Sequence, residues 1–277
     1  MIMKHKKLFM GTLLLTAISL LFSCQPKAGS KPFGNMTFDS IQINRTDHLV
    51  TSDTTSPACN LIINYVYPIQ CDSTSIKDSV LQAVTTATFG KDYKNKTATE
   101  AVDSYQQNYV ENYRNDLMAS YLESKDDSEE QEQWFSYYEQ IEARPLLDNP
   151  LYLIYELKTS EYRGGAHGMY ATHYLNFDPA TGHLMNLHDI FYDGFEPTIN
   201  KLLLSKLMKM YDCTTQEELE EAGLLMGTDI YPSQNFCLNT GKITFIYNVY
   251  EIAPYSMGEI EISISYEELA DWLKIKH

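Results

Sequence analysis

Positively charged side chains are scarce in this chain. It has 21 Lys and Arg residues against 37 Asp and Glu residues, which gives a formal net charge of −16 at pH 7. Such a surface repels the phosphates of nucleic acids and the headgroups of anionic lipids, and it attracts cationic partners. We therefore expect no nucleic-acid partner. Solvated acidity is also common on soluble exported domains, so the charge alone does not identify a ligand.

Long hydrophobic runs are also missing. The candidate for a membrane span, residues 8–22, is a mostly apolar run of 15 residues, whereas a spanning helix needs ~20. The run follows Lys4, Lys6 and Lys7 and ends at Ser23 and Cys24. A basic start, an apolar stretch and a small residue at the end are typical of a secretory signal peptide.

The cysteine that closes this segment resembles the lipidated cysteine of bacterial lipoproteins. We expect a signal peptide over residues 1–23, a lipid such as palmitate on Cys24, and a flexible tether over residues 24–35. The lipid would hold the protein at a membrane of the cell envelope, as a periplasmic or outer-membrane lipoprotein. Phe22 is bulkier than the usual occupant of its position. The alternative is an ordinary signal peptide with an incidental cysteine.

Cysteine is sparse in the remaining chain, and no spacing resembles a zinc or redox motif. An exported protein can form disulfides. However, Cys59 and Cys71 flank one predicted strand, which would hold them roughly 40 Å apart, far beyond the ~7 Å that a disulfide allows. We do not expect that pair, and a pairing of Cys213 with Cys237 stays open.

Common catalytic motifs are absent: there is no G-x-S-x-G elbow, phosphate loop or H-E-x-x-H. Four histidines lie within 22 residues and are candidates for the ligands of a metal ion: His167, His173, His183 and His188. On an extended strand, His167 and His173 would lie about 20 Å apart, whereas the ligands of one zinc ion lie ~2 Å from it. We therefore expect no metal site, no cofactor and no catalytic residue.

The rest of the chain has a globular composition, with 44% hydrophobic and 12% aromatic residues. Hydrophobic periodicity and turn residues predict strands at 36–50, 60–69, 134–147, 151–162, 169–178, 183–187 and 259–265, and a hairpin over 236–248. Helices are predicted at 72–90, 99–123, 196–211, 216–222 and 266–274. Strand-and-helix blocks separated by antiparallel hairpins favour an α+β fold with antiparallel or mixed sheets and helices packed on one face. We expect two subdomains, residues 36–160 and 161–277.

Tyrosine is abundant, with 21 residues. Within the helix predicted at 99–123, apolar and tyrosine side chains recur every three or four residues and form one stripe: Val102, Tyr105, Tyr109, Tyr113, Leu117 and Tyr121. Such a stripe is usually the buried face of a helix, and we assign it no cofactor role.

Several short segments carry a family resemblance. Residues 162–168 (YRGGAHG) are followed by 176–178 (NFD), 181–182 (TG) and 187–191 (LHDIF), and later by 246–248 (IYN), 250–255 (YEIAPY) and Gly258. In this order they resemble a widespread bacterial domain pair of undefined function. That pair forms the extracytoplasmic part of RsiV-type anti-sigma factors, which bind lysozyme. It also precedes the catalytic domain of PdaC-type peptidoglycan deacetylases.

The resemblance implies a deacetylase-associated N-terminal subdomain and an RsiV-like C-terminal subdomain that carries the GGAH motif. Only about seven residues precede the apolar run, and no metal-binding Asp/His set of a deacetylase domain is present. We therefore expect neither anti-sigma nor deacetylase activity. The resemblance therefore implies a binding module, whose ligand is lysozyme or cell-wall glycan.

The GGAH motif is expected to form a turn or bulge, because Gly164, Gly165 and Gly168 suit positive φ or a close backbone approach. In this interpretation the ring of His167 hydrogen-bonds and locks the turn. The residues expected to bind a partner lie around this turn and in the segment 250–255 of the resemblance: Tyr162, Arg163, His167, Tyr170, Glu251 and Tyr255.

Three hypotheses for the function follow. The first is an exported, lipid-anchored binding module without catalysis, whose partner is lysozyme or a similar cationic protein. The second is an envelope module that binds peptidoglycan or another glycan, with exposed tyrosines stacking on sugar rings. The third is an unrecognised hydrolase that uses acids near Glu251 and His167, and a deep polar pocket joining those residues would favour it.

Overall fold

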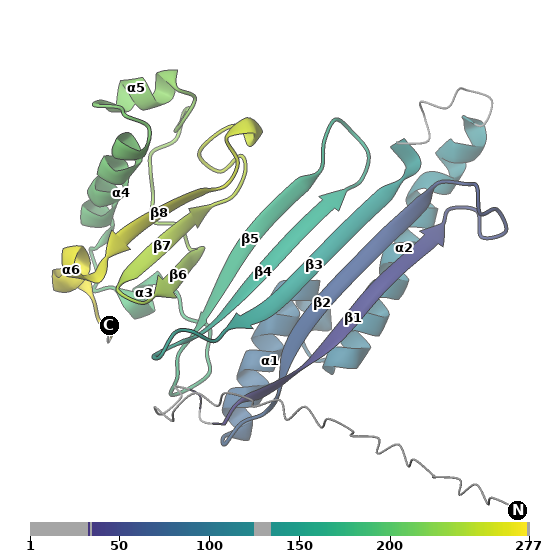
Figure 1. Ribbon diagram of the computed structural model, residues 1–277, viewed down its shortest axis with the longest axis horizontal. Helices are drawn as coiled ribbons and strands as arrows, with labels where there is room; N and C mark the ends of the chain where they lie inside the picture. Colours follow the sequence, from purple (N-terminus) through teal and green to yellow (C-terminus); the bar gives the residue numbers. More distant parts are fainter. Residues whose placement is uncertain (1–32, 34, 125–133, 276–277) are drawn as a thin grey trace, which may run out of the picture.

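The computed structural model describes residue 33 and residues 35–124 and 134–275 (Figure 1). The predicted signal peptide, the lipidated Cys24 and nearly all of the tether lie outside the described residues. Within the described parts of the chain, no helix is both long enough and apolar enough to cross a membrane.

The larger of two sheets has five strands in chain order. They are β1 (Thr37–His48), β2 (Ala58–Gln70), β3 (Tyr137–Leu146), β4 (Leu153–Tyr162) and β5 (Met169–Phe177). Neighbouring strands are antiparallel except β2 and β3, which are parallel. The parallel pair requires a long crossover, and two helices supply it. The predicted strands at 36–50, 60–69, 134–147, 151–162 and 169–178 are thus confirmed.

The crossover helices, α1 (Thr74–Phe89) and α2 (Ala98–Glu123), cover one face of this sheet and leave most of the other face open (Figure 1). Near the start of β4 the second face is covered, because Ile154 packs into the core of the smaller sheet. Their ends follow local sequence signals. Ser73 caps α1, and Thr97 forms a capping box with Glu100 at the start of α2. The tyrosine stripe of α2 packs toward the sheet, with Tyr109 and Tyr113 buried. A hydrophobic core of its own fills the space between these helices and the sheet.

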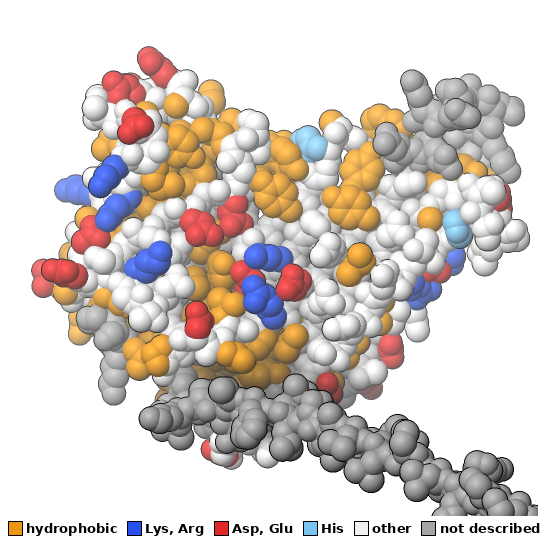
Figure 2. Space-filling model, in the orientation of Figure 1, with side chains coloured by type: hydrophobic (Ala, Val, Ile, Leu, Met, Phe, Trp, Pro, Cys, Tyr) orange, Lys and Arg blue, Asp and Glu red, His pale blue; other side chains and the backbone are white. Residues whose placement is uncertain are grey.

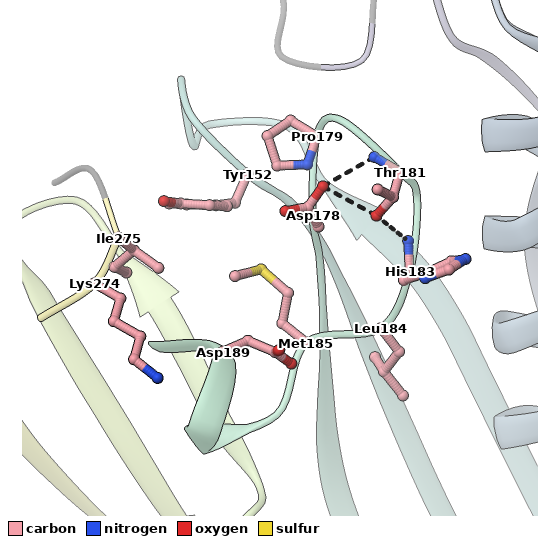
Figure 3. Close-up of a pocket in the computed structure, with 10 residues that line it drawn as sticks. All are labelled: Tyr152, Asp178, Pro179, Thr181, His183, Leu184, Met185, Asp189, Lys274 and Ile275. Atoms are coloured by element: carbon pink, nitrogen blue, oxygen red, sulfur yellow. Dashed lines mark hydrogen bonds between the residues drawn. The ribbon is translucent and has the colours of Figure 1, made fainter. Parts of the chain in front are cut away.

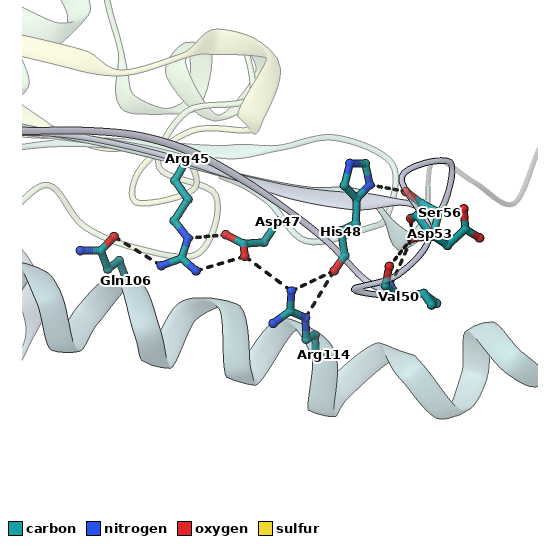
Figure 4. Close-up of polar contacts among 8 residues, drawn as sticks. All are labelled: Arg45, Asp47, His48, Val50, Asp53, Ser56, Gln106 and Arg114. Carbon is teal, nitrogen blue, oxygen red and sulfur yellow. Dashed lines mark hydrogen bonds and ion pairs between the residues drawn. The ribbon is translucent and has the colours of Figure 1, made fainter.

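The edge strand β1 is tied to α2 by charged groups (Figure 4). Asp47 accepts hydrogen bonds from the guanidinium of Arg45 and lies 3.5 Å from that of Arg114. The hydrogen bond from Arg45 holds the pKa of Asp47 below its usual value. Arg114 also donates to the carbonyl of His48, 3.1 Å away. These contacts anchor the edge strand β1 to helix α2.

The smaller sheet contains β6 (Phe236–Asn239), β7 (Lys242–Tyr247) and β8 (Ile260–Ser265), all antiparallel. Helices α3 (Leu187–Ile190), α4 (Glu196–Met210), α5 (Gln216–Glu221) and α6 (Tyr266–Leu269) accompany it. A second hydrophobic core forms here. Two sheets, each with its own helices and core, confirm the predicted α+β class.

Two predicted elements are wrong. Residues 183–187 do not form a strand, because only Leu184 makes an isolated bridge to Phe177. Asn186 instead opens helix α3 through a capping box with Asp189. The predicted closing helix is also too long, since α6 ends at Leu269 and a 3-10 turn over Ala270–Trp272 follows.

The pairing of Cys213 with Cys237, which the sequence left open, does not occur. Cys59, Cys71, Cys213 and Cys237 are all free thiols. Burial raises the pKa of Cys59 to about 11 and that of Cys237 to about 12, so both thiols are protonated at neutral pH.

The boundary expected between residues 160 and 161 falls inside β4, and β5 extends the same sheet. The core beneath α1 and α2 includes side chains up to Phe177, whereas most of the core of the smaller sheet comes from Met185 onward. Tyr152, just before β4, and Ile154, at its start, also belong to the core of the smaller sheet. β4 therefore contributes side chains to both cores, and the two subdomains are not separated at residue 160.

Asparagine side chains join the two sheets along the outer edge of β5. Asn248 accepts from the backbone NH of Thr172 at 2.8 Å, and Asn235 accepts from that of Tyr174 at 3.0 Å. Asn176, in β5 itself, donates to the carbonyl of Phe236 at 2.6 Å and accepts from the NH of Leu238 at 3.0 Å. We call Asn176, Asn235 and Asn248 the asparagine junction. It satisfies backbone groups that the edges of two separate sheets would otherwise leave unpaired.

Candidate functional site

Four aromatic side chains from two distant segments meet at one end of the junction. His167 stacks on Tyr255 with ring centroids 4.0 Å apart and an interplanar angle of 21°. Tyr250 approaches both rings, and its hydroxyl lies 3.2 Å from Nε2 of His167. Tyr170 meets Tyr255 edge to face at 5.7 Å. We call His167, Tyr170, Tyr250 and Tyr255 the aromatic cluster.

The cluster is on the surface. Tyr250 is 56% exposed and Tyr170 is 38% exposed. Figure 2 shows hydrophobic side chains and a histidine gathered at the upper rim, between the loop that joins β4 to β5 and the loop that precedes β8. Large exposed aromatic groups on a monomeric surface typically mark an interaction site.

The first contributing loop is shaped by glycine. Gly164 and Gly165 have φ of +79° and +106°, a region that L-residues rarely adopt. A Cβ on Gly168 would lie 2.7 Å from both the carbonyl oxygen of Glu161 and the hydroxyl of Tyr138. The ring of His167 hydrogen-bonds the Gly168 carbonyl through Nδ1 at 3.0 Å. The geometry is the turn that the sequence predicts at this motif.

The second contributing loop carries a strained residue. Tyr250 has φ of +69°, although it is not glycine. It follows Asn248 of the asparagine junction by two residues, so the start of this loop is fixed to β5. Gly258 closes the loop, where a Cβ would lie 3.4 Å from the hydroxyl of Tyr170. Glycine at 168 is therefore required by the packing of the first loop against its own sheet, whereas glycine at 258 suits a backbone with φ of +75° beside Tyr170.

Only part of the predicted binding set converges. His167, Tyr170 and Tyr255 belong to the aromatic cluster. Tyr162 instead stacks on Tyr138 at 6.2 Å, and its hydroxyl donates to the Gly165 carbonyl. Glu251 is exposed beside Tyr250 in the chain.

Arg163 points to the opposite face of the sheet, toward α2. Its guanidinium pairs with Glu161 at 2.7 Å and lies 3.8 Å from Oε2 of Glu139. Tyr105 of α2 donates to the other oxygen of Glu139 at 2.6 Å. Burial raises the pKa of Glu139. Arg163 therefore fixes the base of the GGAH loop and does not belong to the exposed cluster.

The sequence prediction missed Tyr250 as a member of the cluster and Tyr138 as the partner of Tyr162. Tyr138 could have been inferred from register, because β3 and β4 pair directly and place it opposite Tyr162. The position of Tyr250 depends on its positive φ, which no sequence pattern indicates for a tyrosine.

Acidic side chains border the cluster on the side of β8. Glu259 follows Gly258, and burial, followed by repulsion from Glu261, raises its pKa. Lys158 and Arg144 lie on this side too, and both pair with Glu156, at 3.1 and 2.5 Å. Figure 2 shows acidic and basic side chains gathered below the hydrophobic upper rim. The surroundings of the cluster therefore offer no excess of positive charge.

A cavity of about 410 Å³ lies at the other end of β5 (Figure 3). Since β5 has nine residues, this cavity lies roughly 25 Å from the aromatic cluster. Its carboxylates have structural roles: Asp178 accepts from the backbone of Ala180 and Thr181, and Asp189 completes the α3 capping box. The cavity is not lined by His167 or Glu251, so it does not join the residues of the hydrolase hypothesis. Among the described residues, no group of three or more His, Cys, Asp or Glu side chains is placed to hold a metal ion.

Comparisons with known proteins give a family and a fold. The family model described as "Protein of unknown function (DUF3298)" matches residues 188–267, which include α4 and the smaller sheet. A crystal structure of a DUF3298 family member from Bacteroides fragilis NCTC 9343 is 40% identical, covers 88% of this chain and 96% of its own, and superposes with a TM-score of 0.83.

A second crystal structure, of a DUF3298 family protein from Pseudomonas aeruginosa PAO1, is 17% identical with a TM-score of 0.61. It covers 88% of this chain and 96% of its own, and it supports the fold alone. No curated protein matches the chain.

Proposed function

Because the chain belongs to the DUF3298 family, whose domain has no assigned function, we propose its role from the surface that it exposes. It is a binding module of the cell envelope without catalysis, held at the membrane by lipid on Cys24. Its partner is a cationic protein such as lysozyme, and the aromatic cluster makes the contact.

The exposed aromatic cluster carries this proposal. It projects from two loops and does not line a deep pocket, so it suits insertion into a partner's cleft better than capture of a small molecule. Aromatic side chains contribute much of the binding energy of protein interfaces, because their rings bury large areas at low entropic cost. Among the three tyrosines of the cluster, Tyr250, with 56% of its surface exposed, has the most area to bury.

Charge supports a cationic partner. The chain has a formal net charge of −16, and Glu251 and Glu259 adjoin the cluster in the chain. A negative field would increase the rate of encounter with a positive protein, and salt would weaken it within a Debye length of about 8–10 Å. The resemblance of segments 162–168 and 250–255 to RsiV-type lysozyme-binding proteins, and to the module of PdaC-type deacetylases, supports a role in the envelope.

Calorimetric titration of the full-length protein with lysozyme tests the proposal. We expect binding at low salt that weakens as salt rises, together with inhibition of lysozyme. Tyr250→Ala should weaken binding at least tenfold, as expected for an interface anchor worth more than about 1.4 kcal/mol.

Tyr192→Ala is the matched control, because Tyr192 is 53% exposed and lies just beyond α3, away from the cluster. It should bind as the unmodified protein does. Absence of both heat and inhibition would refute the proposal for lysozyme, and equal losses in the two variants would refute the assignment to the cluster.

A further inference from the structure

The open face of the five-stranded sheet has an unusual chemistry for this chain. Side chains alternate along each strand, so Tyr137, Glu139 and Ile141 face α1 and α2 while Tyr138 and Gln140 face the other way. The register between neighbouring strands shows which residues lie side by side on the open face. Thr46, Asn60, Tyr138 and Tyr162 form one row, and Asn44, Ile62, Gln140, Ser160 and Tyr170 form the next.

Amide side chains are frequent on this open face. Five of them come from three neighbouring strands: Gln42, Asn44, Asn60, Asn64 and Gln140. Gln42, Asn44, Asn60 and Gln140 are exposed, and Asn64 is half-buried. Figure 2 shows the result as a broad white area over β1 to β4.

The open face is also electrically balanced. Its charged residues lie together at one side and pair with each other: Arg144 lies 3.3 Å from Glu142, and both Arg144 and Lys158 pair with Glu156. The two acids and two bases cancel, in a chain whose formal net charge is −16. Net neutrality on one face of so acidic a protein removes the electrostatic attraction that a cationic partner would need.

A shallow groove of about 240 Å³ runs over this face beside β5. Gln140, Ser160 and Thr172 line it with amide and hydroxyl groups, and Tyr170 lines it with a ring. Glu142 and Lys158 also line it, and their opposite charges leave the groove without a net charge. Amides both donate and accept hydrogen bonds, hydroxyls do the same, and a tyrosine ring offers a flat apolar surface. Sugar rings present the complementary combination of hydroxyl edges and apolar C–H faces.

We propose that the open face is a binding site for a neutral, linear oligosaccharide. A row across the five strands spans about 19 Å, which suits several linked sugar rings better than one. In the uncovered part of β1, β2 and β3, the aliphatic residues of this face are Ile62 and Val66, and both are half-buried. The face therefore lacks the apolar centre that interfaces between copies of one chain have. The proposed site shares Tyr170 with the aromatic cluster but does not include Tyr250, so the two proposals can be tested separately.

The test uses the full-length protein and four-ring β-1,4-linked oligosaccharides of N-acetylglucosamine and of glucose, titrated calorimetrically. A carboxylated oligosaccharide of equal length serves as the charged comparison. We expect binding of at least one neutral oligosaccharide and weaker binding of the charged one. Gln140→Ala should weaken the neutral complex about tenfold, since it removes hydrogen bonds at the centre of the open face.

Gln107→Ala is the matched control, because Gln107 is an exposed amide on α2, on the other side of the sheet. It should bind the oligosaccharide normally, as should Tyr250→Ala, which separates this site from the aromatic cluster. Absence of heat with both neutral oligosaccharides at millimolar concentration would overturn the proposal. So would unchanged affinity in Gln140→Ala, or loss of lysozyme binding in that variant with no effect on sugar.

Discussion

The asparagine junction makes a quantitative prediction, which we develop for Asn176. This residue is 1% exposed and lies at the edge of β5 that meets the smaller sheet. Replacement by leucine keeps the approximate shape and removes both polar atoms. The carbonyl of Phe236 then loses its donor at 2.6 Å, and the NH of Leu238 loses its acceptor at 3.0 Å.

The expected loss follows from those two backbone groups. Each buried backbone group left without a partner costs about 1–3 kcal/mol. Partial hydration at the separated edges would reduce the total, so we expect the free energy of unfolding to fall by about 3 kcal/mol in Asn176→Leu. Mutations away from such features usually change it by less than about 0.5 kcal/mol.

Urea unfolding, followed by far-UV circular dichroism, measures this difference. Asn44→Leu is the matched control, because Asn44 is an exposed amide on β1. We expect the transition midpoint of Asn176→Leu to shift clearly below that of the control, with the slope retained. A free energy for Asn176→Leu within about 0.5 kcal/mol of the control would refute the claim that this side chain joins the sheets.

Three further predictions concern local structure. Gly168→Ala should lower the free energy of unfolding by about 1–3 kcal/mol, measured by urea titration, because the new Cβ would lie 2.7 Å from the Glu161 carbonyl oxygen, which cannot move freely. Thr97→Ala removes the capping box of α2 and should cost about 1 kcal/mol in the same assay. Hydrogen bonds from Lys206 and Ser265 lower the pKa of Glu268 to about 2 from 4.5. Its contribution to stability is therefore complete above pH 4.5 and is lost as the pH falls toward 2, and Lys206→Met should raise its titration midpoint in NMR.

The elements that the sequence predicted well are those whose signals are local. Alternation along β2 and the N-cap of α2 each depend on neighbouring residues, so their positions could be predicted to within two residues. The prediction of a strand at 183–187 was wrong because a second local signal decided the structure of this segment. Its weak alternation competed with the capping box formed by Asn186 and Asp189, and the cap determined the structure.

The site was predictable only in part. Strand parity alone could have placed Arg163 on the helix side, since it has the same parity as Glu161 and Leu157, and Leu157 is buried beneath the helices. The meeting of His167 with Tyr250, 83 residues later, could not be deduced in this way. It depends on which edge of one sheet faces the other, and side-chain amides determine that contact.

The asparagine junction therefore links the fold to the proposed recognition surface. Tyr250 can adopt a positive φ only where the surrounding structure compensates a cost of about 1–2 kcal/mol. Asn248, two residues earlier, is buried and bound to the backbone of Thr172, so the loop leaves β7 from a fixed point. Tyr170 lies two residues before Thr172, the residue that Asn248 binds. Both halves of the aromatic cluster are thus held by one pair of hydrogen-bonded residues, which preorganises the rings for binding and reduces the entropy lost when a partner docks.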